Sequence, residues 1–448
     1  MSNALPPLFP PPFSTCFTQI PLVLAALFVI IVKNESFIYN SPKVTTRGCI
    51  NTLLLQGGAG MRNLVFFFRT LLILFVITVH LPASVSADNK IRIGVSLGLT
   101  GRFSPMAAMQ EKGFRLWEKD VNNRGGILGR KVELVIYNDN SDPQTAAGHY
   151  KKLILQDKVD LLFGPISTGI TAAVLPITEK HGYPLLITGA ASDTLWQQGY
   201  RGAFGVYTPA SKFSVGFLEM IAMEGFMKVA IASANDGFSR STAGGTKKWG
   251  ERFGLEIVFY EEFEKGSKDL DEIATSAKFS GAQVLIVAGH LAESVQMKKS
   301  LKRIGWSPDI YYSSIGPALS SFRELLGEDA DKSFSSSQWE SGCAFCPPEL
   351  IDFKTSFEAA YKKAPSYHAA AAFAGGQIFE SVLRGTKKID NDKIRNLLYS
   401  SDINTALGRY GVDKTGKQLR HFPLIVQWQK GQKEIVWPKN LRTAKPVF

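Results

Sequence analysis

The stretch from Val159 to Ser192 reads VDLLFGPISTGITAAVLPITEKHGYPLLITGAAS, and its pattern decides the fold. Val159–Phe163 and Pro184–Ile187 are continuous apolar runs, which predict two buried strands. Thr171–His181 lies between them and has the apolar spacing of a helix. A strand, a crossover helix and a second strand in so short a span form a βαβ unit, whose strands are parallel and whose crossover is right-handed. The turns that follow the two strands therefore emerge at the same edge of the sheet.

Small polar residues fill both turns. Ser167 and Thr168 stand in the first turn, at the start of the predicted helix, and Ala190 and Ser192 stand in the second. Free backbone N–H groups, a helix dipole and short hydroxyls at one edge suit a small anion such as a carboxylate. Two ordinary turns without a ligand are the alternative, and these residues alone do not separate the two.

Strands and helices alternate through most of the chain. Ile91–Gly98 predicts a strand followed by a loop that holds Phe103, and the alternation restarts near Val206. We therefore predict an α/β protein of two Rossmann-like lobes with parallel sheets. Loops of the second run carry Phe238 and His290 just after predicted strands. Such loops bind ligands in open α/β sheets, so two facing edges would form a cleft.

The last part of the chain departs from this alternation. Phe353–Lys362 and Ala369–Arg384 predict helices that have no strand of their own, so we expect them to cover the first lobe. Phe422–Trp428 and Glu434–Trp437 predict two final strands.

The front of the chain predicts a targeting segment. An apolar core, Thr70–Val79, follows Met61, and the small residues Val85–Ala87 offer a cleavage site, as in a secretory signal peptide. This core is shorter than the about 20 residues of a membrane span. We predict a signal peptide over residues 61–87 and interpret residues 1–60 as an upstream over-extension of the reading frame. A genuine N-terminal membrane anchor is the alternative.

Composition narrows the class of protein. A chain that is 45% hydrophobic and 20% charged is globular rather than disordered. The net charge of +12 would suit nucleic acid, but the basic residues are scattered among acidic ones along the predicted helices. We therefore expect a solvated basic surface and no nucleic-acid partner.

The sequence offers little for catalysis. Cys343 and Cys346 form a close pair that, in an exported protein, predicts a local disulfide, with a thioredoxin-like redox site as the alternative. No second Cys/His pair stands at zinc spacing, and no nucleophile elbow, His-Glu-x-x-His or phosphate loop occurs. We expect no enzyme activity, no catalytic residue, no metal and no cofactor.

Several short motifs occur in a family-specific order from Asn89 to about Pro438. They are Ile91–Gly94 leading to Thr100-Gly101, the run VNNRGGILGR at Val121–Arg130, Asn138-Asp139 with Asp142-Pro143, Phe163–Pro165, Gly205–Ser211 and Gly408–Tyr410. In these motifs the chain resembles the bacterial periplasmic binding proteins of branched-chain amino acid ABC importers, the leucine/isoleucine/valine-binding type.

The resemblance implies a type I periplasmic binding fold, in which three hinge crossings join the two lobes. On that pattern, lobe one spans 90–207 and 340–413, and lobe two spans 208–339 and 414–448. The implied function is capture of a small carboxylate-bearing solute, an amino acid in the family, and its delivery from the periplasm to an ABC permease in the inner membrane. A ligand-sensing subunit of a signalling system is an alternative with the same fold.

The resemblance also implies a binding site. In the family, the ligand carboxylate is held by the turns that match Ser167, Thr168, Ala190 and Ser192, which are the groups that the turn chemistry indicates. Phe103, in the loop after the first predicted strand, is a further expected contact.

The second lobe departs from the amino-acid pattern. Phe238 matches a family tyrosine and lacks its hydroxyl, and Ile315 aligns with the acidic residue that receives the ligand's ammonium. Burying an ammonium without a counter-charge is costly, so Asp236, Glu293 or His290 would have to replace that acid. His290 also has a purely structural interpretation. An aliphatic or aromatic carboxylate without an amine is therefore the alternative to an amino acid.

Overall fold

A computed structural model describes residues 90–342, 348–386 and 388–448 of this chain. The predicted signal peptide, residues 1–60 and the pair Cys343 and Cys346 lie outside the described residues. Within the described part, no helix is both long and apolar enough to cross a membrane.

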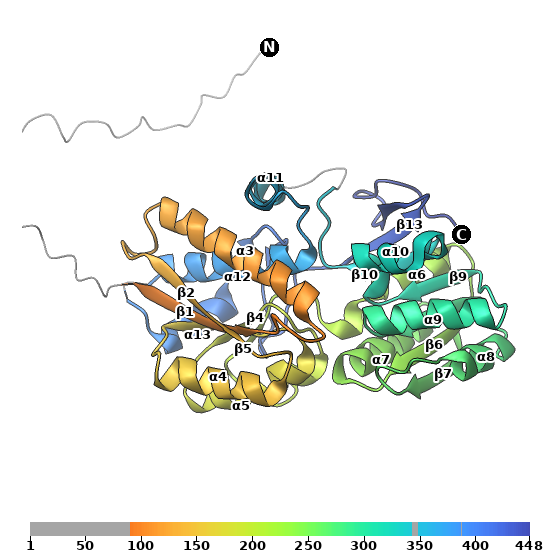
Figure 1. Cartoon of the computed structure of the whole chain (residues 1–448), viewed down its shortest axis with the longest axis horizontal. Helices are drawn as coiled ribbons and strands as arrows, with labels where there is room; N and C mark the ends of the chain where they lie inside the picture. The colour runs from red at the N-terminus through yellow and green to blue at the C-terminus, as the bar shows by residue number, and fades with distance from the viewer. Residues whose placement is uncertain (1–89, 343–347, 387) are drawn as a thin grey trace, which may run out of the picture. The chain divides into compact units, whose positions relative to one another are not determined.

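The first lobe is built on a parallel sheet of five strands in the order β2-β1-β3-β4-β5 (Figure 1). Its strands are β1 (Ile91–Leu97), β2 (Val132–Asn138), β3 (Leu161–Phe163), β4 (Leu185–Ile187) and β5 (Ala203–Gly205). Its helices are α3 (Ser104–Asn123), α4 (Pro143–Leu155), α5 (Thr168–Lys180), α11 (Pro348–Tyr361), α12 (Tyr367–Arg384) and α13 (Asn391–Ser400), with a 3-10 turn at Asp193–Trp196 and two short strands, β11 (Ile403–Asn404) and β12 (Arg409–Tyr410). Helices α4 and α5 cover one face of this sheet, and α3 and α12 cover the other.

The second lobe holds a sheet of seven strands in the order β14-β13-β10-β9-β8-β6-β7. Its strands are β6 (Lys228–Ala234), β7 (Glu256–Phe263), β8 (Val284–Ala288), β9 (Ile310–Ser313), β10 (Ser333–Ser337), β13 (Leu424–Gln429) and β14 (Gln432–Trp437). Its helices are α6 (Val215–Met223), α7 (Gly237–Arg252), α8 (Asp271–Phe279), α9 (Leu291–Arg303) and α10 (Ser320–Leu326), with 3-10 turns at Ala210–Lys212, Gly316–Ala318 and Gly327–Ala330.

The predicted βαβ unit is β3, α5 and β4. Leu162 pairs with Leu185 in parallel register, as the sequence pattern requires. Helix α5 begins at Thr168, earlier than the apolar spacing indicates, because the Ser167 hydroxyl accepts a hydrogen bond from the N–H of Ile170 at 3.3 Å and caps the helix. The prediction of an α/β fold with two lobes is confirmed.

The second sheet differs from the prediction in not being wholly parallel. Strand β13 runs antiparallel to both β10 and β14. Lys430 and Gly431 alone join β13 to β14, and both have positive φ, of 48° and 82°. A two-residue turn of this kind connects only antiparallel strands, since parallel strands need a long crossover.

The late helices cover the first lobe, as expected, with α12 packed along α3. The two helices approach closely because glycines stand at the contact. A Cβ on Gly376 would lie 2.0 Å from Cδ2 of Trp117, and one on Gly113 would lie 2.2 Å from the carbonyl oxygen of Ala369. The small residues of α12 are therefore a packing requirement of lobe one.

We expect Gly376→Ala to lower the free energy of unfolding by about 1 to 3 kcal/mol, the usual cost of overpacking a core. The measurement is urea unfolding followed by circular dichroism. Gly148→Ala is the control, because Gly148 is exposed in α4 and its added Cβ would meet nothing within 4 Å. That control should be neutral or slightly stabilising. Equal stability of the two variants would contradict this packing argument.

Three connections pass between the lobes, from β5 to α6, from β10 to α11 and from β12 to β13. Each connection contributes one residue to a group of three that are joined by hydrogen bonds: Thr208, Gln338 and His421. The N–H of Thr208 donates to Oε1 of Gln338 at 3.0 Å, the Thr208 hydroxyl donates to the carbonyl of His421 at 3.0 Å, and Nε2 of His421 lies 2.8 Å from the carbonyl of Gln338. These hydrogen bonds tie the three crossings together in one place.

Candidate functional site

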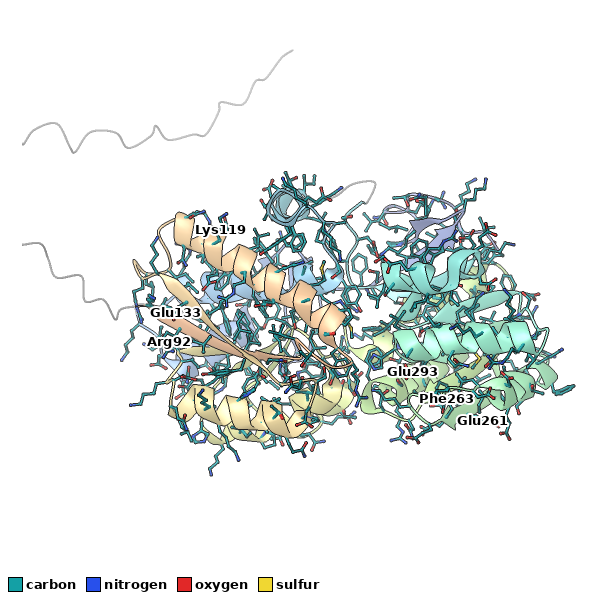
Figure 2. The ribbon with its side chains drawn as sticks, in the orientation of Figure 1. Arg92, Lys119, Glu133, Glu261, Phe263 and Glu293 are labelled. Atoms are coloured by element: carbon teal, nitrogen blue, oxygen red, sulfur yellow. The ribbon has the colours of Figure 1, made fainter. Side chains whose placement is uncertain are left out.

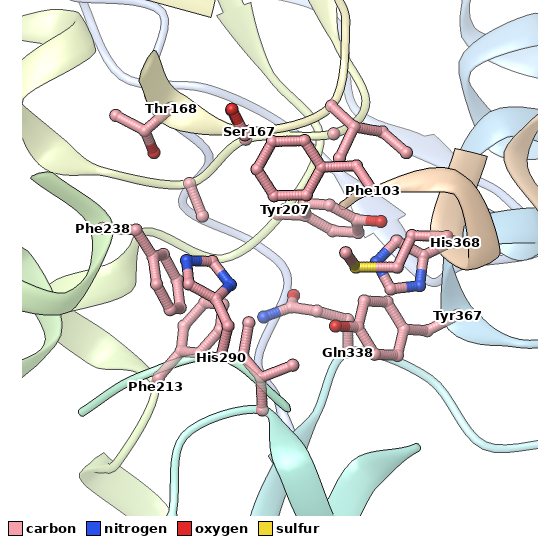
Figure 3. A pocket seen from close by; sticks show the side chains of 16 residues that line it. Phe103, Ser167, Thr168, Tyr207, Phe213, Phe238, His290, Gln338, Tyr367 and His368 are labelled. Atoms are coloured by element: carbon pink, nitrogen blue, oxygen red, sulfur yellow. The ribbon is translucent and has the colours of Figure 1, made fainter. Parts of the chain in front are cut away.

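A cavity of about 50 Å³ lies between the two lobes, where strands of both sheets end (Figure 3). Its wall combines loops that follow β1, β3, β4, β6, β8 and β9 with residues of the hinge and the start of α12. The lining residues are Phe103, Met106, Ile166, Ser167, Thr168, Gly189, Ala190, Ala191, Tyr207, Phe213, Phe238, His290, Ile315, Gln338, Tyr367 and His368. The cavity therefore lies at the carboxyl ends of the strands, as expected for open α/β sheets.

Ser167 and Thr168 form what we call the anion end of the cavity. The backbone of Ser167 has φ of 82°, a conformation that residues other than glycine rarely adopt and that concentrates at functional sites. The Thr168 hydroxyl oxygen is buried and has no hydrogen-bond partner among the described residues. The N–H groups of Thr168 and Gly169, in the first turn of α5, have no acceptor within the helix. Together these donors suit a carboxylate.

Tyr207, Gln338, Tyr367 and His368 form the hinge end of the cavity, away from Ser167 and Thr168 in Figure 3. The ring of Tyr367 stacks on His368 at a centroid distance of 4.1 Å, and Tyr207 meets the Tyr367 ring edge-on at 5.8 Å. Lobe two supplies a second aromatic group, in which Phe238 lies 5.1 Å from the ring of His290. Aromatic rings thus face the cavity from both lobes.

The described residues of the wall include no Asp, Glu, Lys or Arg. Asp236 and Glu293, which the sequence offered as replacements for the missing acid at Ile315, both lie outside the wall. Glu293 stands at the start of α9 (Figure 2), where its two oxygens accept the N–H groups of His290 and Gly266, each at 3.0 Å. Its carboxylate is therefore occupied with capping the helix.

Asp236 is likewise occupied. It caps α7 by accepting the N–H groups of Phe238 and Ser239, and it lies 3.2 Å from Nζ of Lys265 and 3.7 Å from Nε2 of His290. Burial raises the pKa of Asp236, but the hydrogen bond and charge of His290 and the charge of Lys265 outweigh it, so the pKa lies below its usual range. Asp236 is a charged cap behind the cavity and does not line it.

The structure brings seven of the eight predicted site residues into the wall: Phe103, Ser167, Thr168, Ala190, Phe238, His290 and Ile315. Ser192 is the exception. Its side chain is buried outside the wall, where its hydroxyl donates to the carbonyl of Gly237 at 2.8 Å and pairs with the hydroxyl of Ser241 at 2.7 Å. Its third partner is the Thr194 hydroxyl of lobe one, at 2.9 Å. Because Gly237 and Ser241 belong to lobe two, the Ser192 hydroxyl joins the lobes.

The hinge end was not predicted. Tyr207 and Gln338 lie on crossings, and Tyr367 and His368 open a helix that the sequence indicated only as a cover. No local pattern brings these segments together. The lobe boundaries that the family resemblance implies could have indicated two of these residues, since Tyr207 and Gln338 lie at or next to such boundaries.

Burial makes His368 a source of acid sensitivity. It lowers the pKa of His368 to about 3, while an unfolded histidine titrates near 6.5. As the pH falls below 6.5, the unfolded state binds a proton first, so folding stability falls until the pH approaches 3. From pH 7.5 to 5.0 this histidine should remove about 2 kcal/mol from the free energy of unfolding. Burial also lowers the pKa of His421, to about 4, which adds a loss in the same direction.

His368 and His421 together lower the free energy of unfolding between pH 7.5 and 5.0. We expect His368→Phe, which keeps the stacking on Tyr367, to show about half of that decrease. Urea unfolding of both proteins at pH 7.5 and 5.0 gives the comparison. The same drop in both would show that His368 is protonated in the folded state.

The comparisons with known proteins agree with this architecture. The family described as periplasmic binding protein matches residues 90–433. The Leu/Ile/Val-binding protein homolog 7 of Brucella suis is 23% identical over 388 residues, which cover 82% of this chain and 96% of that protein.

Among solved structures, the branched-chain amino acid transporter substrate binding protein LivJ from Streptococcus pneumoniae, in complex with isoleucine, has a TM-score of 0.70 at 22% identity and covers 78% of this chain and 100% of its own. A solute binding protein of an ABC transporter from R. palustris, in complex with benzoate, has a TM-score of 0.67 at 16% identity and covers 80% and 98%. These likenesses show the fold. The resemblance seen in the sequence is confirmed, and the chain belongs to the periplasmic binding protein family.

Proposed function

We propose that this protein is the extracytoplasmic solute-binding component of an ABC importer and that its solute is an aromatic carboxylate without an amine. The observation that carries the proposal is a cavity with donors for an anion, aromatic walls and no acidic side chain. Amino acids, which the family resemblance favours, are the competing class.

The anion end supports the carboxylate. Thr168 offers a buried hydroxyl without a partner, and the first turn of α5 adds backbone N–H groups and the positive end of the helix dipole. A carboxylate bound there would accept charge-assisted hydrogen bonds, which are stronger than neutral ones.

The rest of the wall disfavours an amino acid. An ammonium in this cavity would be buried among Phe238, Ile315 and their neighbours without a carboxylate in the described wall to pair with it. Moving an unpaired charge out of water costs several kcal/mol. A ring carrying only a carboxylate avoids that cost and buries its apolar surface against aromatic side chains. The benzoate bound by the R. palustris neighbour shows that the fold accommodates such a solute.

The contacts between the lobes support capture by hinge closure. Ser192 donates across the gap to Gly237, and Asp193 accepts from the N–H and hydroxyl of Ser211 at 3.0 and 2.9 Å. The cavity of about 50 Å³ is smaller than the about 150 Å³ cavity that holds benzene in another protein. The lobes therefore have to open to admit a ring and to stand further apart around it than they do in this structure. Tighter binding of the solute to the closed than to the open arrangement would supply the shift of the equilibrium toward closure. The closed form would be presented to the permease, and no reaction on the solute is implied.

Thermal melting of the purified protein against separate solute panels tests this function. The panels are benzoate and phenylacetate, aliphatic carboxylates, and the amino acids leucine, isoleucine and phenylalanine. A solute at about 100 times its dissociation constant adds roughly 2.7 kcal/mol to stability. We expect a clear shift with the aromatic acids and none with the amino acids. A shift with amino acids alone would refute the proposal.

A further inference from the structure

Gln338 places an unused hydrogen-bond donor at the hinge end. Its side chain is buried, with 3% of the residue exposed, and Nε2 has no partner among the described residues. The orientation of the amide is fixed, because Oε1 accepts from the N–H of Thr208, which can only donate. The group that lacks a partner is therefore the NH₂ group.

Tyr207 adds a second unused polar group. The residue is 4% exposed, lines the cavity, and its hydroxyl has no partner in the described part of the chain. Burial raises the pKa of Tyr207 well above its usual value, so the hydroxyl keeps its proton and is able to donate. Buried polar groups are mostly paired in native proteins, and two unpaired ones at the hinge end, in addition to Thr168 at the anion end, indicate a second polar partner.

We propose that the hinge end binds an oxygen substituent on the solute's ring, on the side away from the carboxylate. This proposal rests on the proposed function, since it says where a second polar group of the same aromatic acid would bind. The solute is then a ring with a carboxylate at the anion end and a hydroxyl or carbonyl oxygen at the hinge end.

A phenolic hydroxyl suits the chemistry of either unused group. Its oxygen can accept from Nε2 of Gln338, or the hydroxyl can donate to the Tyr207 hydroxyl or accept from it. A methyl group of similar size offers neither bond and leaves both groups buried and unpaired. Gln338 also accepts a hydrogen bond from Thr208, which lies on a different connection between the lobes. A solute bound to Gln338 would therefore contact the hinge at a point where two of its three crossings meet.

Paired ligands test this assignment. Dissociation constants are measured by calorimetry for 4-hydroxybenzoate against 4-methylbenzoate, and for 4-hydroxyphenylacetate against 4-methylphenylacetate, so that two spacings between ring and carboxylate are covered. We expect the hydroxyl compound to bind roughly 10- to 100-fold more tightly in at least one pair. In Tyr207→Phe that preference should fall several-fold. Tyr361→Phe is the matched control and should keep it, because Tyr361 lies outside the cavity and bonds to the carbonyl of Lys112.

The outcomes separate this assignment from the proposed function. Binding of benzoate and both members of each pair with equal affinity would overturn the hinge-end assignment and leave the proposed function standing. A hydroxyl preference unchanged in Tyr207→Phe would place the substituent elsewhere and also overturn it. No binding of any aromatic acid would refute both. Tyr207→Phe removes only a hydroxyl that makes no bond to the described residues, so we expect the variant to fold and the comparison to be valid.

Discussion

Replacing Ile315 with glutamate should abolish binding of aromatic carboxylates. Ile315 is 8% exposed and lines the cavity from lobe two. A carboxylate there would stand in a wall whose described residues include no Lys or Arg, and it would repel the bound anion in a poorly solvated space. A penalty of about 4 kcal/mol corresponds to a loss of roughly 1,000-fold in affinity. Calorimetry with benzoate at pH 7.5 gives the measurement.

Two further variants isolate the charge. Ile315→Gln adds a similar shape and polarity without charge, and Ile315→Met preserves an apolar side chain. We expect losses below about tenfold for both, and melting curves establish that all three variants are folded. Equal binding of benzoate by Ile315→Glu and Ile315→Gln would contradict the argument that the absence of an acidic residue at position 315 disfavours an amino acid.

The sequence predicted the elements whose signals are local. Val159–Phe163 and Pro184–Ile187 are apolar runs, and the segment between them has helical spacing, so β3, α5 and β4 follow from hydrophobic periodicity. The anion end was predictable for the same reason, because turns after parallel strands fall at one edge. Ser167 and Thr168 follow β3 closely, so predicting that strand is enough to locate them.

Strand β10 escaped prediction because it reads SFSSS and is nevertheless buried throughout. Ser336 lies 2.7 Å from the hydroxyl of Tyr312, which is distant in sequence, and Ser337 donates to the carbonyl of the nearby Trp339 at 2.9 Å. The hydroxyls of Ser333 and Ser335 have no partner among the described residues. Hydropathy counts such serines as surface residues. A polar strand in a core can be recognised only when the strands on either side of it, here β9 and β13, are known.

Ser192 shows the same limit at the site. The turn that contains it was placed at the correct edge, and its neighbour Ala190 does line the cavity. The direction of the Ser192 hydroxyl depends on the carbonyl of Gly237 in the other lobe, which no pattern around residue 192 reveals. The hinge end is the hardest part of the site to predict from sequence, because its residues come from separate crossings and from the start of α12.

Thr168→Val should weaken binding of the aromatic carboxylate by roughly 10- to 100-fold, since hydrogen bonds to charged groups contribute about 1.5 to 3 kcal/mol. Valine has nearly the shape of threonine and lacks only the hydroxyl, which makes no bond to the described residues. The free protein should therefore be as stable as the wild type or slightly more stable. Thr168→Ser, which retains the hydroxyl, should bind almost normally. Calorimetry and urea unfolding of the same samples separate the two quantities.

Ser167→Ala provides the contrast that makes this result specific. The Ser167 hydroxyl caps α5, so its loss should cost about 1 kcal/mol of folding stability and affect affinity less than Thr168→Val does. On the proposed function, the Ser167 hydroxyl caps the helix and the Thr168 hydroxyl binds the solute. If Ser167→Ala lost more affinity than Thr168→Val, the capping hydroxyl would have to leave the helix to bind the anion, and the unpaired Thr168 hydroxyl would not mark the anion site.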